Sequence, residues 1–250
     1  MTRVSSQTAA FMLFLLGFSF SGSVSNLAMA DPAPRPQAAN KPEAIADTSK
    51  ARTLGIVLFP QFELLDVYGP VEMFGNLGSK MKVIMVAQTA GSVASAQGPK
   101  VVADYGFDNC PDLDLIMVPG GIGTRTQISN AKILDWLRQR SAKAEIVMSV
   151  CTGSALLAKA GLLDGHRATS NKQFFKFAVG LGPKVNWVKE ARWVDDGDRV
   201  TSSGVTAGID MALHVIARLY GDKIAQRLAD GTEYQWHRDP TQDPFAKFAK

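Results

Sequence analysis

The chain has no run of five or more Lys and Arg residues, although 27 Lys and Arg against 23 Asp and Glu give it a net charge of +4. Part of this basic excess lies towards the two ends of the chain, outside its most apolar part. Proteins that bind nucleic acids concentrate basic residues in a patch or stripe. The sequence therefore predicts no nucleic-acid partner.

Long apolar runs are absent beyond the first thirty residues, and none reaches the roughly 20 residues that a membrane-spanning helix needs. The shorter run from Ala9 to Phe20 follows Arg3 and precedes Ala28-Met-Ala30, a small-residue cleavage pattern. We predict that residues 1–30 form a Sec-type signal peptide cleaved after Ala30, with an uncleaved anchor as the alternative. The mature chain is then expected in the periplasm or secreted, without further membrane contact.

Residues 31–43 are rich in Pro and Ala and contain no large apolar side chain. Such a segment cannot bury enough surface to order itself, so residues 31–51 are predicted to form a flexible tether. Residues 52–250 are dense in apolar side chains, with an irregular tail from Tyr234, and are long enough for a single domain.

Cysteine is scarce, with only Cys110 and Cys151 in the chain. An oxidising compartment favours pairing them. However, Cys110 lies in a loop that leads into a predicted strand, whereas Cys151 follows the end of another. We therefore expect the two thiols at opposite ends of the sheet and unpaired.

Short apolar strands alternate with amphipathic segments, which predicts an α/β domain with a mostly parallel sheet covered by helices on both faces. The expected strands are 53–59, 82–87, 113–118, 146–150, 185–188, 191–195 and 200–202, with a further strand pair at 92–96 and 101–105. The expected helices are 62–77, broken at Gly69-Pro70 so that Pro70 lies in the first turn of the main helix, and 131–144, 152–160, 171–179, 208–220 and 222–229.

Cys151 stands between the strand 146–150 and the helix 152–160. A side chain at such a sharp strand-to-helix turn, a nucleophile elbow, projects from the edge of the sheet where α/β proteins bind ligands. The N–H groups of the following helix favour a thiolate there. The pattern predicts a nucleophilic Cys151 of lowered pKa, and the alternative is an inert buried cysteine.

Two further segments are expected at the same edge. Gly120 and Gly121 follow the strand 113–118, where glycine lets backbone N–H groups approach a substrate as in an oxyanion hole, unless the pair only forms a turn. Asp66 follows the first strand in an apolar setting, which indicates a functional acid, although an N-cap of the next helix is the alternative.

Several segments in this order resemble the PfpI/ThiJ superfamily of class I glutamine-amidotransferase-like proteins, and within it the isonitrile hydratase branch. The resemblance implies a flavodoxin-like sandwich, commonly homodimeric, with a small-molecule substrate and neither metal nor organic cofactor. The matching segments are Phe59-Pro60, Leu65-Asp-Val-Tyr-Gly-Pro70, Val118-Pro-Gly-Gly121, Ser149-Val-Cys-Thr-Gly153, Ala160-Gly-Leu-Leu-Asp-Gly165, Arg167-Ala-Thr169 and Gly204-Val-Thr-Ala-Gly-Ile-Asp210.

The resemblance implies that Cys151 is the nucleophile, that Asp66 is the acid near its sulfur and that Thr152 is an auxiliary hydroxyl. The N–H groups of Gly121 and Thr152 would then form an anion pocket. Attack of Cys151 on an isonitrile carbon would yield a thioimidate, and water would release an N-substituted formamide. Pocket walls are expected from Tyr68, Ile122, Phe174 and Trp236.

The chain departs from many relatives at Asn171, which stands where a histidine partner of the cysteine is expected. Chemistry through a Cys–His pair is therefore disfavoured. His166 is expected to face solvent, His214 to pack or cap a contact, and His237 lies in the tail.

Two other functions remain open. One is a cofactor-free glyoxalase or deglycase acting on small oxoaldehydes, which usually needs a helping histidine. The other is a non-enzymatic periplasmic redox or ligand-sensing module, because an exposed thiolate of low pKa oxidises readily. Similar domains occur in AraC-type regulators.

Overall fold

The computed structural model describes residues 49–249. The predicted signal peptide and all but the last three residues of the predicted tether lie outside this range, so both stay predictions. The described part begins just before the first strand, where Lys50 Nζ lies 2.7 Å from Asp114 Oδ1 and Arg52 pairs with Glu145 at 2.8 Å. Within it, no helix is both long enough and apolar enough to cross a membrane.

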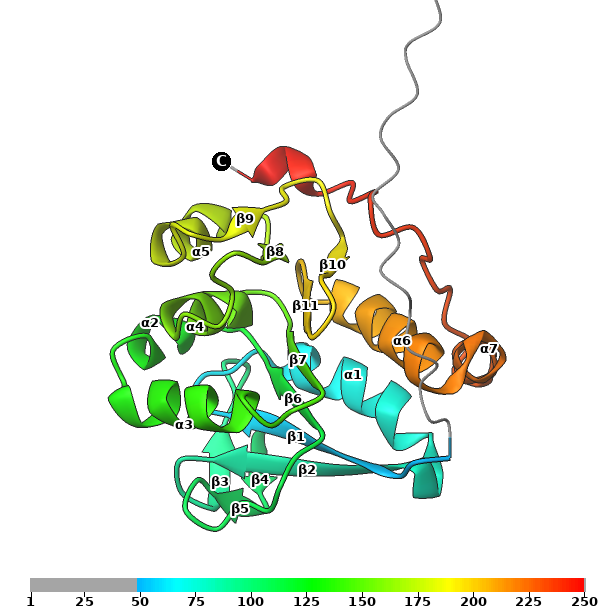
Figure 1. Cartoon of the computed structure of the whole chain (residues 1–250), viewed down its shortest axis with the longest axis horizontal. Coiled ribbons are helices and arrows are strands. Elements are labelled where there is room, and N and C mark those ends of the chain that lie inside the picture. Colours follow the sequence, from blue (N-terminus) through cyan, green and yellow to red (C-terminus); the bar gives the residue numbers. More distant parts are fainter. Residues whose placement is uncertain (1–48, 250) are drawn as a thin grey trace, which may run out of the picture. The chain divides into compact units, whose positions relative to one another are not determined.

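A seven-stranded sheet forms the centre of the fold, in the order β10-β11-β7-β6-β1-β2-β5 (Figure 1). All neighbouring strands are parallel except β10, which pairs antiparallel with β11. This confirms the predicted mostly parallel, flavodoxin-like α/β fold. The strands are β1 (Arg52–Leu58), β2 (Met81–Ala87), β5 (Tyr105–Gly106), β6 (Leu115–Val118), β7 (Ile146–Ser149), β10 (Trp193–Asp195) and β11 (Arg199–Ser202).

The central strands are apolar throughout because both of their faces are covered. All residues of β6 and β7 are buried. Helices α3 and α4 pack together on one side, whereas α1 and α6 pack together on the other, with α7 against α6 (Figure 1). The helices are α1 (Leu64–Gly75), α2 (Thr124–Gln127), α3 (Ala131–Ser141), α4 (Gly153–Lys159), α5 (Phe175–Leu181), α6 (Ala207–Tyr220) and α7 (Asp222–Gly231), with short 3₁₀ turns η1 (Gly78–Lys80) and η2 (Ala246–Phe248).

Helix α1 differs from its prediction. It runs unbroken from Leu64 to Gly75 with Pro70 in its interior, so Pro70 does not start a separate helix. The helix tolerates this because it packs closely on α6: a Cβ on Gly69 would lie 2.8 Å from Ile209 Cγ1. That packing offsets the one backbone hydrogen bond that proline cannot donate. Because α1 starts at Leu64 rather than near Gly69, Asp66 lies within its first turn.

The remaining elements lie outside the main sheet. The predicted strand pair forms the antiparallel β3 (Gly91–Ala94) and β4 (Lys100–Ala103). Two-residue strands β8 (Arg167–Ala168) and β9 (Asn186–Trp187) pair beside α5, and the sequence did not predict β8 or α2. The segment after α7 has no regular element until η2.

Candidate functional site

Cys151 occupies the corner between β7 and α4, in a left-handed backbone conformation with φ of 57°. Three hydrogen bonds hold this unfavourable geometry. Its N–H donates to the Ser203 carbonyl at 3.0 Å, and its carbonyl accepts from the Ser154 and Ser170 hydroxyls at 3.1 Å each. Gly153 completes the turn, because a Cβ there would lie 2.1 Å from the Val118 carbonyl oxygen. The elbow is thus built from segments far apart in the sequence.

Asp66 is completely buried beside this corner. Its Oδ2 accepts a hydrogen bond of 2.7 Å from the Gly120 N–H, which ties α1 to the loop after β6. Its Oδ1 is also buried and has no hydrogen-bond partner among the described residues. The capping alternative is wrong, since Glu63 is the N-cap of α1 and Asp66 lies inside the helix with its Oδ2 bound to Gly120. The acid is therefore held in place through its Oδ2, beside the Cys151 thiol.

Burial is the largest influence on the pKa values of both Asp66 and Cys151. It raises the pKa of Asp66 well above 3.8, and the nearby Glu63 charge adds to the effect, while the Gly120 N–H and the Cys151 thiol oppose it. Burial also raises the pKa of the Cys151 thiol well above 9.0, helped by the Asp66 charge. The groups that favour the thiolate are the Thr152 N–H and hydroxyl and the Asn171 side chain, none of them a cation. The expected lowering of the Cys151 pKa is therefore wrong.

Gly120 and Gly121 permit close contact rather than present free donors. A Cβ on Gly120 would lie 2.6 Å from Thr152 N and 2.9 Å from Asp66 Oδ2. The Gly120 N–H binds Asp66, and the Gly121 N–H donates to Thr152 Oγ1 at 3.1 Å. Both glycine N–H groups are thus engaged within the protein, contrary to a preformed anion pocket. Gly121 also has φ of 118°, a conformation that favours glycine and that turns contain, so this angle does not exclude the turn alternative.

Asn171 lies at the Cys151 corner, because its side chain is one of the groups that lower the Cys151 pKa. Its Oδ1 also accepts from the N–H groups of Gln173 at 2.9 Å and Phe174 at 3.3 Å. Asn171 therefore connects the thiol to the segment that starts α5. The side chain at the expected histidine position is a hydrogen-bonding amide, which cannot serve as a base.

The predicted pocket residues have different surroundings. Tyr68, Ile122 and Phe174 are exposed by 46%, 48% and 41%, respectively, as unshielded apolar side chains. Trp236 instead packs against the core and lies under Arg238, whose Cζ is 3.9 Å from its ring centroid. The first three side chains are exposed, as the predicted role of pocket walls requires. Trp236 is instead packed against the core.

The histidines are engaged elsewhere. His166 Nδ1 lies 2.9 Å from Asp196 Oδ2, so it is paired rather than simply solvated, and His214 Nε2 lies 2.8 Å from Asp195 Oδ2. The backbone N–H of His237 donates to the Asp210 carboxylate. Among the described residues, no histidine contributes to the Cys151 pKa shift. Cys110 and Cys151 are both free, Cys110 in the loop before β6.

A buried polar network behind the elbow was not predicted. Lys172 Nζ donates to Thr169 Oγ1 at 2.8 Å and the Ala191 carbonyl at 2.6 Å, and lies 3.7 Å from Asp243. Burial lowers the pKa of Lys172 to about 8. The Ser203 hydroxyl donates to Asp243 at 2.6 Å. No local pattern reveals these residues, because Asp243 lies 40 positions from Ser203 and 71 from Lys172.

A second buried pair secures the tail. Asp210 accepts from Arg192 Nε at 2.7 Å, from the Tyr234 hydroxyl at 3.1 Å and from the His237 N–H at 2.9 Å. The Arg192 N–H donates to the Pro240 carbonyl, and its carbonyl accepts from the Ser203 N–H. The tail is therefore linked to the strand-end residue that holds Cys151.

Asp210→Asn is expected to destabilise the fold by about 3–5 kcal/mol, because it leaves the buried Arg192 without a counter-charge. The matched control is Asp222→Asn, whose carboxylate pairs with Arg238 at the surface. That exposed pair is expected to contribute far less, because solvent screens the two charges. Denaturant unfolding of both variants measures the difference, and equal losses would contradict the assigned role of Asp210.

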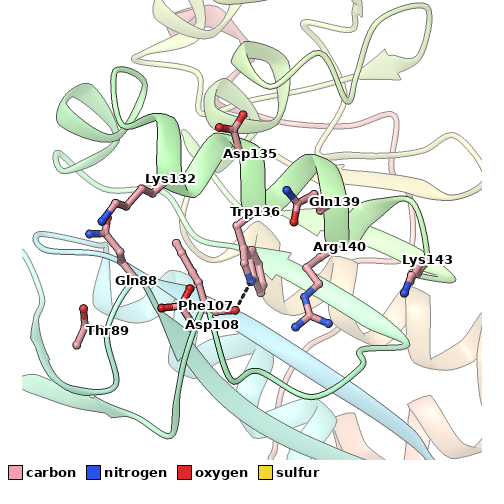
Figure 2. A pocket seen from close by; sticks show the side chains of 10 residues that line it. All are labelled: Gln88, Thr89, Phe107, Asp108, Lys132, Asp135, Trp136, Gln139, Arg140 and Lys143. Carbon is pink, nitrogen blue, oxygen red and sulfur yellow. Dashed lines mark hydrogen bonds between the residues drawn. The ribbon is translucent and has the colours of Figure 1, made fainter.

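A separate hollow of about 810 Å³ lies between α3 and the loops after β2 and β5. Figure 2 shows Phe107 and Trp136 at its centre, with the Trp136 Nε1–H donating to the Phe107 carbonyl at 3.2 Å. None of the predicted site residues lines it. Among residues 49–249, no group of three or more His, Cys, Asp and Glu side chains is arranged to hold a metal ion.

Residues 52–218 match the model of the DJ-1/PfpI family. The chain belongs to the DJ-1/PfpI family. A ThiJ/PfpI family protein from Pseudomonas syringae has a similar structure, with a TM-score of 0.70 and 33% identity over 82% of this chain and 84% of that one. The resemblance drawn from the motifs is thereby confirmed.

Family members named for different activities resemble this chain. It is 39% identical over 184 residues to isonitrile hydratase from Pseudomonas putida, covering 74% of this chain and 79% of that protein. It is 28% identical over 189 residues to the transcriptional regulator GbdR from Pseudomonas aeruginosa, of which it spans about half, 51%. These relatives thus include both an enzyme and a regulator. Similarity alone therefore does not decide between the two functions for this chain, and the residues of the site have to be considered.

Proposed function

We propose that this DJ-1/PfpI family protein is a cysteine-dependent hydratase that converts isonitriles into N-substituted formamides. The observation that carries the proposal is the buried Asp66 carboxyl beside the Cys151 thiol, with a raised pKa and an unpartnered Oδ1. A carboxyl that stays protonated near neutral pH can act as a general acid. The similarity to isonitrile hydratase supports the same chemistry.

The reaction begins with a neutral acid and a neutral thiol, which suits a substrate whose terminal carbon accepts both a proton and a nucleophile. Asp66 donates its proton to that carbon while Cys151 Sγ forms a bond to it. The thiol proton moves to the substrate nitrogen. The product of this half-reaction is a protonated thioimidate, and Asp66 is left as a carboxylate.

The second half-reaction uses that carboxylate as a base. Asp66 removes a proton from water, and the water oxygen bonds to the thioimidate carbon. The carbon–sulfur bond then breaks, and the remaining hydroxyl proton returns to Cys151 as the carbonyl forms. One isonitrile and one water yield one formamide, and both side chains regain their starting protonation.

Other residues of the site have positioning roles in this proposal. Thr152 and Asn171 interact with the thiol, and Thr152 Oγ1 also holds the Gly121 N–H. Gly120 fixes the Asp66 carboxyl through its N–H. Tyr68, Ile122 and Phe174 supply exposed apolar surface for the substrate's R group. We further propose action in the periplasm or outside the cell, as a homodimer.

The similarity to GbdR favours one second candidate, a ligand-binding module without turnover. Redox sensing fits the site less well, because an oxidant-sensing cysteine needs an exposed thiolate. Here the thiol is 5% exposed and burial raises its pKa. The glyoxalase alternative is less well supported, because no histidine among the described residues interacts with the Cys151 thiol.

The deciding experiment incubates the purified protein with n-butyl isonitrile and measures N-butylformamide over many turnovers. We expect multiple turnovers, one formamide for each isonitrile consumed, and the Asp222→Asn surface variant to match the wild type. Saturable binding of the isonitrile without formamide would support the ligand-binding candidate. Turnover of methylglyoxal but not of the isonitrile would support the glyoxalase alternative.

A further inference from the structure

Arg125 is an exposed cation on α2 whose charge has no acidic partner. Its Cζ lies 4.8 Å from the Phe174 ring centroid and 5.2 Å from that of Phe177. No carboxylate in residues 49–249 forms an ion pair with it. Contact with two rings orients the guanidinium by cation–π attraction and leaves its N–H donors uncommitted.

The two segments that meet at Arg125 both contact the elbow. On one side, Thr124 Oγ1 donates to the Gly121 carbonyl at 2.8 Å and lies 3.3 Å from Thr152 Oγ1. On the other side, Asn171 interacts with the thiol and accepts the Phe174 N–H at 3.3 Å. Arg125 thus joins α2 to the start of α5 next to Cys151. Figure 1 shows α2 and α5 at the edge towards which the β2 arrow points.

We call the exposed residues Ile122, Arg125 and Phe174, which lie in the two segments that contact the elbow, the mouth of the site. This mouth combines apolar surface with charge. Phe174 offers exposed apolar surface against the guanidinium, and Ile122, three residues before Arg125, is exposed as well. On the side of Asp66 lies Glu63, whose charge raises the Asp66 pKa and whose carboxylate accepts a hydrogen bond of 2.8 Å from the Gln97 side chain. A substrate anion would be repelled on the Glu63 side and attracted on the Arg125 side. The planar fork of Arg matches a carboxylate.

We propose that Arg125 determines substrate specificity by binding a carboxylate on the R group, so that the preferred substrates are isonitriles with an apolar or short body and an acidic end. This inference rests on the proposed hydratase function for the identity of the reacting group. The binding of an anion beside Cys151 does not depend on that function.

The first test compares kcat/KM for isocyanoacetate and its uncharged methyl ester. Arg125→Gln is expected to lower kcat/KM for the anion roughly 10- to 100-fold, the range for a lost hydrogen bond to a charged group, while the ester changes little. Arg125→Lys should rescue part of the loss, because it keeps the charge but not the fork. The matched control Arg227→Gln removes an exposed charge on α7 and should leave both substrates unchanged.

Equal losses for acid and ester in Arg125→Gln would overturn the proposal and leave Arg125 as a packing residue. A wild-type preference for the ester would overturn it as well. Added salt is expected to reduce the preference for the acid, since screening weakens attraction between exposed charges.

The second test has a readout that needs no turnover. In a Cys110→Ser background, alkylation of Cys151 is measured at alkaline pH, where a thiol of raised pKa ionises. The ratio of the rates with iodoacetate and iodoacetamide reports anion attraction at the mouth. We expect Arg125→Gln to lower that ratio about tenfold, with iodoacetamide as the internal control for access. A lowered ratio without isonitrile turnover would retain the anion site and reject the hydratase. An unchanged ratio with ester turnover would reject the anion site alone.

Discussion

Cys151→Ser is expected to abolish formamide production, with a loss of roughly 10⁴-fold or more, as for other enzymes deprived of their nucleophile. Serine preserves the side-chain shape and the three backbone hydrogen bonds that hold the corner at φ of 57°. Its hydroxyl is a much poorer nucleophile than a thiol when no base is hydrogen-bonded to it. The loss should therefore fall on kcat rather than on folding.

Cys110→Ser is the matched control, because it removes the other buried thiol. Cys110 lies in the loop before β6, and its pKa is raised mainly by burial. We expect this variant to retain wild-type turnover with a modest loss of stability. Thermal unfolding should report similar Tm values for Cys151→Ser and the wild type. Substantial turnover by Cys151→Ser would rule out the thioimidate route.

Asp66→Asn is expected to lose about 10²- to 10⁴-fold in kcat, the usual contribution of a positioned general acid. The same variant should be more stable than the wild type at neutral pH. Folding raises the pKa of this carboxyl above its ordinary 3.8. Between pH 3.8 and the native pKa, the native state therefore binds more protons than the unfolded state. Stability from Asp66 is therefore present at low pH and lost as pH rises through the native pKa.

Asparagine has no proton to lose and can still accept the Gly120 N–H, so its stability advantage should grow with pH. Tm measured from pH 4 to 8 should diverge between the two proteins, by about 2–4 °C for each kcal/mol gained. A constant Tm difference over this range would contradict a buried, protonated Asp66. Turnover by the wild type should also decline as pH rises through the pKa of this acid.

Local pattern was sufficient for the main elements. β1, β2, β6, β7, α3, α4 and α6 lie within a few residues of their predicted bounds. These segments bury one stripe or both faces, so their periodicity carries the signal. The nucleophile elbow was equally visible, because an apolar strand, Cys151 and a glycine-containing helix start are adjacent in the chain.

The errors have a common physical cause. Pro70 was expected to begin a helix because its local preference is strong, yet close packing of Gly69 on Ile209 carries α1 through it. Cys151 was expected as a thiolate from the adjacent helix, but burial beside Asp66 acts in the opposite direction. In both cases a contact with a distant segment outweighs the local preference.

The family, the order of elements and the placement of Asp66 near Cys151 could be read from the chain, because each depends on short motifs and on apolar periodicity. The protonation of the pair, the engagement of Gly120 and Gly121, the Lys172 and Asp210 networks and the unpaired Arg125 at the mouth could not. They depend on burial and on partners far apart in the sequence, up to the 85 positions between Asp66 and Cys151. Such contacts form only when the sheet brings its strand ends together, and it is there that this protein acquires its chemistry.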